Sequence, residues 1–317
     1  MKRFWLALVM LASCASALPR VEREEQGVKG TQAARPSPAR VDAAQLLGDV
    51  RVLASDAMEG RAAGTPGGAR ARAYVAGRFA QAGVKPLGPA LEQPFELRAR
   101  EGRSNRGANV VGFVEGSRRP SGLIVVTAHY DHLGVRDGQV YNGADDNASG
   151  TAALIQLAAH FAREQPAHTL VFAALDAEED GLQGASALVE SLKREGRDVA
   201  LNVNLDMVGH SERGELYAAG THHTRALRPH LERVAASARV KLLLGHDRPE
   251  DGGGDWTKQS DHFAFHREKI PFVYFGVEDH RDYHKPSDDF ETLTTDFYLG
   301  AVETILDALK ALDANLK

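Results

Sequence analysis

The sequence has a single cysteine, no excess of basic charge and no apolar run long enough to cross a membrane. Because Cys14 stands alone, an intrachain disulfide framework and a thiolate-rich zinc site are excluded, so a metal site has to use histidine and carboxylate. The 43 acidic and 38 basic residues give a net charge of −5, which provides no electrostatic basis for binding nucleic acid. The 31 glycines and 13 prolines among 317 residues are too few for a collagen-like or low-complexity chain.

The N-terminus has the pattern of an export signal. Lys2 and Arg3 precede an apolar run over residues 4–12, which is far shorter than the ~20 residues of a transmembrane helix but typical of a signal peptide. Residues 11–14 (LASC) resemble a bacterial lipobox, in which the cysteine is lipidated. We therefore predict a lipoprotein-type signal peptide over residues 1–17, with cleavage before Cys14. Ordinary cleavage after residues 15–17 (ASA) is the alternative.

Both kinds of cleavage predict an exported protein. It would be an outer-membrane lipoprotein facing the periplasm of a bacterial cell envelope, or a secreted protein, and the membrane would be contacted only through a lipid at Cys14. Residues 18–40 contain charged residues, Gly, Pro and Ser with almost no apolar periodicity, which predicts a flexible linker. The remaining residues 41–317 are predicted to form one domain.

The pattern of apolar residues predicts an α/β fold. Residues 43–53 and 69–83 have the spacing of amphipathic helices. Further along, apolar strands alternate with helices, with strands at 107–113, 122–127, 169–175 and 200–208 and helices at 151–164 and 185–194. This alternation predicts a mixed, mostly parallel twisted sheet flanked by helices on both faces.

Acids and histidines follow the predicted strands. In such sheets ligands bind at the carboxyl ends of the strands, so residues just past each apolar run are the candidates. They are His129 and Asp131, Asp145 and Asp146 before the following helix, Glu178 and Glu179, Asp206, and His284 after the apolar run 270–277. Clustered carboxylates repel one another, and bound cations are the simplest compensation. Histidine combined with carboxylate favours zinc, whereas Ca²⁺ and Mg²⁺ prefer all-oxygen sites.

Five ordered motifs carry a family resemblance. AHYDH, NGADDNASG, DAEEDGLQGA, NLDMVG and YHKPSDD lie between Ala128 and Asp289, and LASDAMEGRAAGTPGG precedes them. They resemble the di-zinc aminopeptidases, which are zinc-dependent exopeptidases with a phosphorylase/hydrolase-like α/β fold and relatives of bacterial leucyl aminopeptidase and glutamate carboxypeptidase. Several motifs in one order are far more specific than a single short match.

The resemblance implies a role for each matching residue. His129, Asp146 and Asp206 would bind one zinc ion. Asp146, Glu179 and His284 would bind a second, so Asp146 bridges the two, and Co²⁺ or Mn²⁺ are possible substitutes. Asp131 would orient His129, Glu178 would be the general base, and Tyr283 would donate a hydrogen bond to the tetrahedral intermediate. Backbone alternation past the strand also predicts that Glu178 and Glu179 point in opposite directions.

Other readings of single residues remain. Asp145 can be a helix cap, His132 a hydrogen-bonded neighbour, and His262 and His266 one face of a helix, while His280 is a weaker candidate than His284. The predicted function is an exported metalloaminopeptidase that hydrolyses N-terminal residues from peptide substrates. The alternatives are a carboxypeptidase-like or dipeptidase-like relative, a glutaminyl cyclase on the same fold, and a non-catalytic metal-stabilised binding protein.

Overall fold

The computed structural model describes Met1, residues 40–98 and residues 100–316. The predicted cleavage site at Cys14 and nearly all of the predicted linker lie outside the described residues. Residues 39–317 form one compact unit. Among the described residues, no helix combines the length and the apolar character needed to span a membrane.

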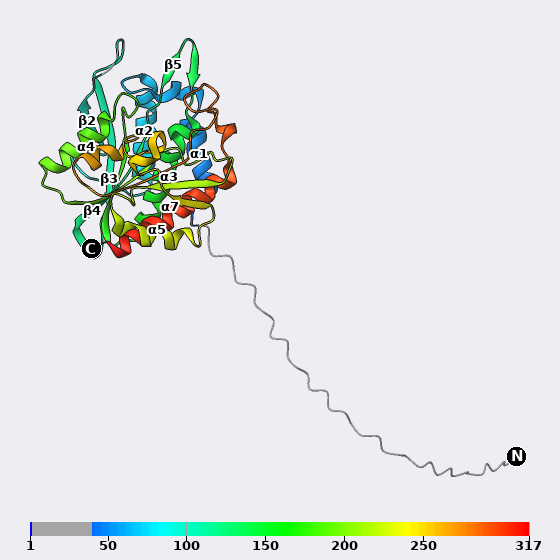
Figure 1. Cartoon of the computed structure of the whole chain (residues 1–317). Helices are drawn as coiled ribbons and strands as arrows, with labels where there is room; N and C mark the ends of the chain where they lie inside the picture. Colours follow the sequence, from blue (N-terminus) through cyan, green and yellow to red (C-terminus); the bar gives the residue numbers. More distant parts are fainter. Residues whose placement is uncertain (2–39, 99, 317) are drawn as a thin grey trace. The chain divides into compact units, whose positions relative to one another are not determined.

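The elements alternate along the chain as the apolar pattern predicts (Figure 1). The helices are α1 (Ala43–Leu53), α2 (Pro66–Gln81), α3 (Gly150–Arg163), α4 (Gln183–Arg194), α5 (Arg228–Ala235), α6 (His262–Arg267) and α7 (Thr295–Asn315). The strands are β1 (Lys85–Pro86), β2 (Glu92–Glu96), β3 (Arg106–Val114), β4 (Arg119–His129), β5 (Gly134–Arg136), β6 (Gln139–Tyr141), β7 (His168–Leu175), β8 (Val199–Leu205), β9 (Glu215–Ala219), β10 (Lys241–Leu244) and β11 (Phe272–Gly276).

The first two helices begin at side-chain caps. Asp42 accepts a hydrogen bond from the backbone N–H of Gln45 at 3.0 Å, so α1 begins at the predicted residue. Thr65 caps α2 through the N–H of Gly68, and Pro66 occupies the first turn, where its missing N–H costs nothing. The predicted start of α2 was three residues too late because its Pro-Gly-Gly opening has the composition of a turn.

The central strands β7, β4, β8 and β11 run parallel, and the strands that flank them, β3 and β9, run antiparallel to them. The sheet order is β1-β3-β7-β4-β8-β11-β9-β10, with β2 paired to β3, and β5 and β6 form a separate hairpin. Strand β4 pairs in parallel with β7 and β8, and β11 pairs in parallel with β8. Strand β3 is antiparallel to β7, and β9 is antiparallel to β11. The predicted mixed, mostly parallel sheet is therefore confirmed, and its parallel part brings four carboxyl ends to one edge.

Both faces of the sheet are covered. Along β4, Ile124 and Val126 pack into a core with α1, α2, α3, α5 and α7. The alternate residues Leu123 and Val125 pack into a second core with α4 and α6. Because successive side chains of a strand point to opposite faces, a continuous apolar run is what a strand buried on both sides requires.

Candidate metal centre

The parallel strands deliver the predicted residues to one edge of the sheet. His129 is the last residue of β4, and Asp206 directly follows β8. Glu178 and Glu179 lie in the turn after β7, where the N–H groups of Gly181 and Leu182 both donate to the carbonyl of Glu178. His284 lies in the loop after β11. The prediction that strand ends gather these side chains agrees with their positions.

Asp146 lies between two histidines from different loops. Its Oδ1 is 3.4 Å from Nε2 of His129, and its Oδ2 is 3.0 Å from Nε2 of His284. It sits in the irregular turn Ala144–Ser149 that precedes α3, with a cis peptide bond to Asn147. One carboxylate facing two imidazoles with its two oxygens is the arrangement that a bridging ligand needs.

Each side of Asp146 has a further carboxylate. On one side, Oδ1 of Asp206 is 3.2 Å from Nε2 of His129. On the other, Oε2 of Glu179 is 3.6 Å from Nε2 of His284, and its Oε1 is 2.8 Å from Nδ1 of His132. His129, Asp146 and Asp206 form one group with ligand atoms within 4.8 Å of one another, and His132, Asp146 and Glu179 form another.

Asp131 connects His129 to the turn that holds the two glutamates. Nδ1 of His129 lies 3.1 Å from the backbone oxygen of Asp131 and 3.7 Å from its Oδ1. The same carboxylate accepts hydrogen bonds from the backbone N–H groups of Glu178 at 3.1 Å and Glu179 at 3.4 Å. Asp131 therefore fixes the backbone after β7 in addition to facing His129.

The acids of this edge are crowded and buried. Burial raises the pKa of Glu178 well above its usual value. The charge of His129 acts to lower this pKa, and the carboxylates of Asp261 and Asp206 act to raise it further. Burial also raises the pKa of Asp261 to about 8, and neither of its oxygens has a hydrogen-bond partner among the described residues. Burial acts to raise the pKa of Glu179, but the neighbouring imidazoles of His132 and His284 overcome it and lower the pKa.

The donor set fits zinc. Imidazole and carboxylate are the zinc ligands left to a chain with one cysteine, and the two groups around Asp146 contain nothing else. Oε1 of Glu179 has no hydrogen bond of good geometry among the described residues. Divalent cations here would neutralise the buried acids, which explains why so many carboxylates are gathered without arginine or lysine in the cleft.

Comparison with known proteins identifies the family. The model described as "Peptidase family M28" matches residues 109–309, which is more than half of the chain and contains the whole acid and histidine cluster. The chain belongs to Peptidase family M28. The family resemblance predicted from the five motifs is thereby confirmed.

Two curated relatives of this M28 chain have names that state a function. A "Probable zinc metalloprotease" of Leptosphaeria maculans is 38% identical over 141 residues, covering 43% of this chain and 30% of the relative. "Aminopeptidase YwaD" of Bacillus subtilis is 30% identical over 225 residues, covering 66% of this chain and 46% of the relative. The chain thus spans less than a third of the fungal relative and less than half of the bacterial one.

Solved structures share the fold. The zinc aminopeptidase BSAP of Bacillus subtilis matches with a TM-score of 0.68 and 18% identity, over 86% of this chain and 95% of that one. A Bacteroides thetaiotaomicron glutaminyl cyclase bound to N-acetylhistamine matches with a TM-score of 0.67 and 18% identity, over 87% of this chain and 99% of that one. At this identity both likenesses concern the fold alone.

The M28 cluster opens into a cleft with an aromatic wall. A cavity of about 100 Å³ is lined by every predicted site residue except Asp131, which lies behind it. Its other lining residues are Met207, Trp256, Gln259, Tyr274, Val277 and Asp279. The Tyr283 ring stacks on that of His284 with centroids 3.9 Å apart, and burial raises its pKa. The structure therefore brings the eight predicted residues together, while their chemical roles stay predictions.

Two residues of the M28 site were not recognised in the sequence. His132 is buried, and it faces Glu179 more closely than His284 does. Asp288 accepts hydrogen bonds from the N–H groups of Asp145 at 2.9 Å and Asp146 at 3.0 Å, so it holds the backbone of the bridging acid. Both lie inside motifs that carry the family resemblance, His132 in AHYDH and Asp288 in YHKPSDD, but the sequence indicated no site role for either.

Two local predictions were based on the wrong geometry. Strand β7 ends at Leu175 and Ala177 has φ 58°, so Glu178 and Glu179 lie in a turn, where strand alternation does not apply. Asp145 is not a cap of α3, whose N-cap is Ser149. Its Oδ1 instead accepts hydrogen bonds from the N–H of Gly209 at 2.6 Å and from the Ser149 hydroxyl at 3.0 Å.

Proposed function

We propose that this chain is a zinc-dependent aminopeptidase that removes N-terminal residues from peptides, using two Zn²⁺ ions on either side of Asp146. The observation that carries the proposal is the Asp146 carboxylate, whose two oxygens face His129 and His284. Membership of family M28 and the likeness to an aminopeptidase support the reaction class. Asp206 would complete one metal shell and Glu179 the other.

The chain's own residues supply the proton transfers. A Zn²⁺ ion held by these residues would polarise the scissile carbonyl and lower the pKa of water. Glu178 takes a proton from the attacking water and returns it to the leaving nitrogen as the C–N bond breaks, giving a carboxylate and an amine. Burial raises the pKa of Glu178, which suits a group that must hold the proton between those steps. The Tyr283 hydroxyl donates a hydrogen bond to the developing oxyanion.

The charge of the cleft favours a free N-terminus as the group recognised. The described residues that line the cleft include five carboxylates and no lysine or arginine. An ammonium group is attracted by surplus carboxylate, whereas a C-terminal carboxylate would need a cationic partner such as arginine. The same composition disfavours the carboxypeptidase-like alternative.

A matched pair of peptides tests this function. One peptide has a free N-terminus and the other is the same sequence with an acetylated N-terminus, and both are incubated with zinc-loaded protein before mass-spectrometric product analysis. We expect stepwise loss of single residues from the start of the free peptide and no cleavage of the acetylated one. Release from the other end, equal cleavage of both, or cyclisation of an N-terminal glutamine without hydrolysis would overturn the proposal.

We also propose that the protein is exported through its N-terminal segment, with Cys14 lipidated. The support is the sequence pattern of residues 1–17 alone. The intact mass of the protein isolated from its own cells tests it, and we expect a chain that begins at an acylated Cys14. A chain beginning after Ala17 would contradict the lipid anchor but keep export, and an unprocessed chain would contradict both.

A further inference from the structure

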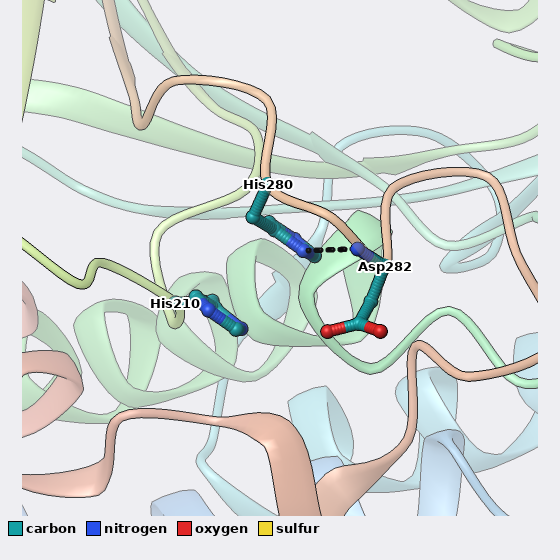
Figure 2. A group of neighbouring side chains, drawn as sticks. All are labelled: His210, His280 and Asp282. Atoms are coloured by element: carbon teal, nitrogen blue, oxygen red, sulfur yellow. Dashed lines mark hydrogen bonds between the residues drawn. The ribbon is translucent and has the colours of Figure 1, made fainter.

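A second group of metal-ligand side chains lies outside the cleft cluster. His210 follows β8 by five residues, and His280 and Asp282 lie in the loop after β11 (Figure 2). Each offers one ligand atom, and these atoms lie within 4.8 Å of one another. The exposed fraction is 6% for His210 and 7% for Asp282, and the side chain of His280 is 5% exposed. Nothing in the proposed aminopeptidase reaction uses these residues.

One histidine of this group has a ring nitrogen without a hydrogen-bond partner. Nδ1 of His210 makes no hydrogen bond of good geometry among the described residues. The two rings are stacked with centroids 4.1 Å apart and planes 2° apart. Two imidazolium rings would repel at this separation, so at least one ring stays neutral and keeps a lone pair.

His280 is oriented as metal-binding histidines are. Its Nε2 lies 3.2 Å from Oδ2 of Asp145, a fully buried carboxylate that is itself held by Gly209 and Ser149. Histidine ligands typically donate one ring N–H to a carboxylate, which leaves the other nitrogen for the metal. The other nitrogen, Nδ1, makes only a long 3.3 Å contact with the backbone N–H of Asp282 (Figure 2).

Asp282 is positioned to supply an anionic ligand. Its Oδ1 accepts a hydrogen bond from the Ser287 hydroxyl at 2.8 Å, which fixes the carboxylate. Its Oδ2 lies 3.3 Å from Nε of Arg281, whose side chain is 77% exposed and can turn into solvent. His210 and His280 also line a cavity of about 500 Å³, through which an ion and water can enter.

We propose that His210, His280 and Asp282 form a separate binding site for one divalent transition-metal ion, with zinc as the preferred ion. Two imidazoles and one carboxylate are a three-ligand set common in zinc sites, and water from the cavity would fill the fourth position. The site is connected to the principal centre through two consecutive residues. Asp145 contacts His280 of this site, and Asp146 contacts His284 of the principal centre. An ion here would fix the loop between β11 and His284.

The test removes one ligand while keeping the stacked ring. His210→Phe cannot coordinate metal, but its ring can still stack on His280. His222→Phe is the matched control, because His222 belongs to none of the candidate metal groups of the described residues. Full-length wild type and both variants are loaded with Zn²⁺, dialysed together, and analysed for zinc per chain by mass spectrometry. Thermal unfolding confirms that each is folded.

We expect His210→Phe to contain one zinc fewer per chain than wild type and His222→Phe, with peptide hydrolysis retained within about twofold. Asp282→Asn is a second variant that should lose the same ion. Equal zinc content in His210→Phe and wild type would overturn the site. Loss of all zinc together with hydrolysis would also overturn it, because His210 would then support the principal centre. Because the test compares the zinc content of the variants with that of wild type, its result does not depend on whether the protein is an aminopeptidase.

Discussion

The carboxylate of Asp146 lies between the two ligand groups of the cleft, because each of its oxygens faces a histidine from a different loop. Its Oδ1 is 3.4 Å from His129 and its Oδ2 is 3.0 Å from His284. Neither the spacing of GADDN nor its composition shows which of the two aspartates takes this place. The resemblance assigned Asp146, and the structure puts that residue in the cleft and turns Asp145 toward Gly209.

Replacing Glu178 should reduce turnover without loss of metal. Glu178→Gln keeps the size of the side chain but cannot accept a proton, so kcat should fall by roughly 100- to 10,000-fold. Zinc content should be unchanged, because Glu178 is not among the groups around Asp146. Steady-state kinetics and metal analysis on the same preparation measure both. A variant with full turnover would eliminate Glu178 as the base.

His262 should make folding stability depend on pH. It is fully buried, its Nε2 lies 3.0 Å from the Trp256 carbonyl, and burial lowers its pKa from 6.5 to about 4. Because the unfolded chain binds the proton first as the pH falls, this group destabilises the folded state from about pH 6.5 down to about pH 4. Between pH 7 and pH 5 the cost should be about 2 kcal/mol.

Urea unfolding of wild type and His262→Phe, with chelator present throughout, measures this contribution. The variant keeps an aromatic ring against Tyr274, where the histidine ring now stacks with centroids 4.6 Å apart. The free energy of unfolding should fall by about 2 kcal/mol less in the variant than in wild type between pH 7 and pH 5. Identical pH dependence of the two proteins would show that His262 does not contribute.

At the scale of elements, one buried arginine joins the loops that carry the ligands. Arg61 is fully buried and donates to the backbone carbonyls of Leu53, Tyr130, Asn142 and Gly143. The Tyr130 carbonyl lies just after β4, and the Asn142 and Gly143 carbonyls lie just before the turn that carries Asp146. Burial lowers the pKa of Arg61 to about 10, so the guanidinium stays charged at neutral pH.

Replacing Arg61 should therefore destabilise the chain severely. Arg61→Met leaves four buried carbonyls without their donor, and the free energy of unfolding should fall by about 3 kcal/mol or more. Arg61→Lys keeps the charge but cannot reproduce the planar set of donors, so it should lose less. Chemical denaturation of the metal-free proteins gives the ranking. If Arg61→Met were as stable as wild type, the arginine would not be joining these loops.

The elements were predictable where burial follows a simple period. The prediction for α1 matches Ala43–Leu53, and the four strands of the central pattern are present, with β4 and β7 containing continuous apolar runs buried on both faces. Helix α7 was missed because it is buried around much of its circumference and so lacks a clear amphipathic period. Strands β9 and β10 were also missed, because they are short; they are the last two strands at one end of the sheet order.

The site was predictable at strand ends and less so in loops. Strand order along a parallel sheet determines where residues such as His129 and Asp206 emerge, so their neighbourhood follows from the pattern. The contact between His132 and Glu179 depends instead on two turns whose backbone angles no local period encodes. For the same reason the hydrogen bonds that Asp288 makes to the backbone of Asp146 could not be foreseen.

At the scale of the whole molecule, bound zinc should stabilise the fold. Ions that bind only the folded chain add stability that grows with free zinc, reaching about 4 kcal/mol per ion at 1,000 times Kd. Removing the ions also leaves the carboxylates of the cleft, such as Asp206 and Glu179, to repel one another without a compensating cation. We therefore expect chelation to lower the melting temperature and abolish peptide hydrolysis.

Scanning calorimetry and activity assays before chelation, after chelation and after zinc is returned measure both effects. Zinc should restore the melting temperature and the hydrolysis together, and Mg²⁺ should restore neither, because it prefers all-oxygen sites. A chelated protein with unchanged melting temperature and activity would contradict metal dependence.

The most direct test of the account is a crystal structure of the zinc-loaded protein with anomalous diffraction recorded on both sides of the zinc absorption edge. We predict two zinc peaks on either side of the Asp146 carboxylate, one contacting His129 and Asp206 and the other contacting Glu179 and His284. A single peak beside Asp146, or none there, would contradict the two-ion centre of the proposed aminopeptidase, whereas an additional peak at His210, His280 and Asp282 would belong to the separate site.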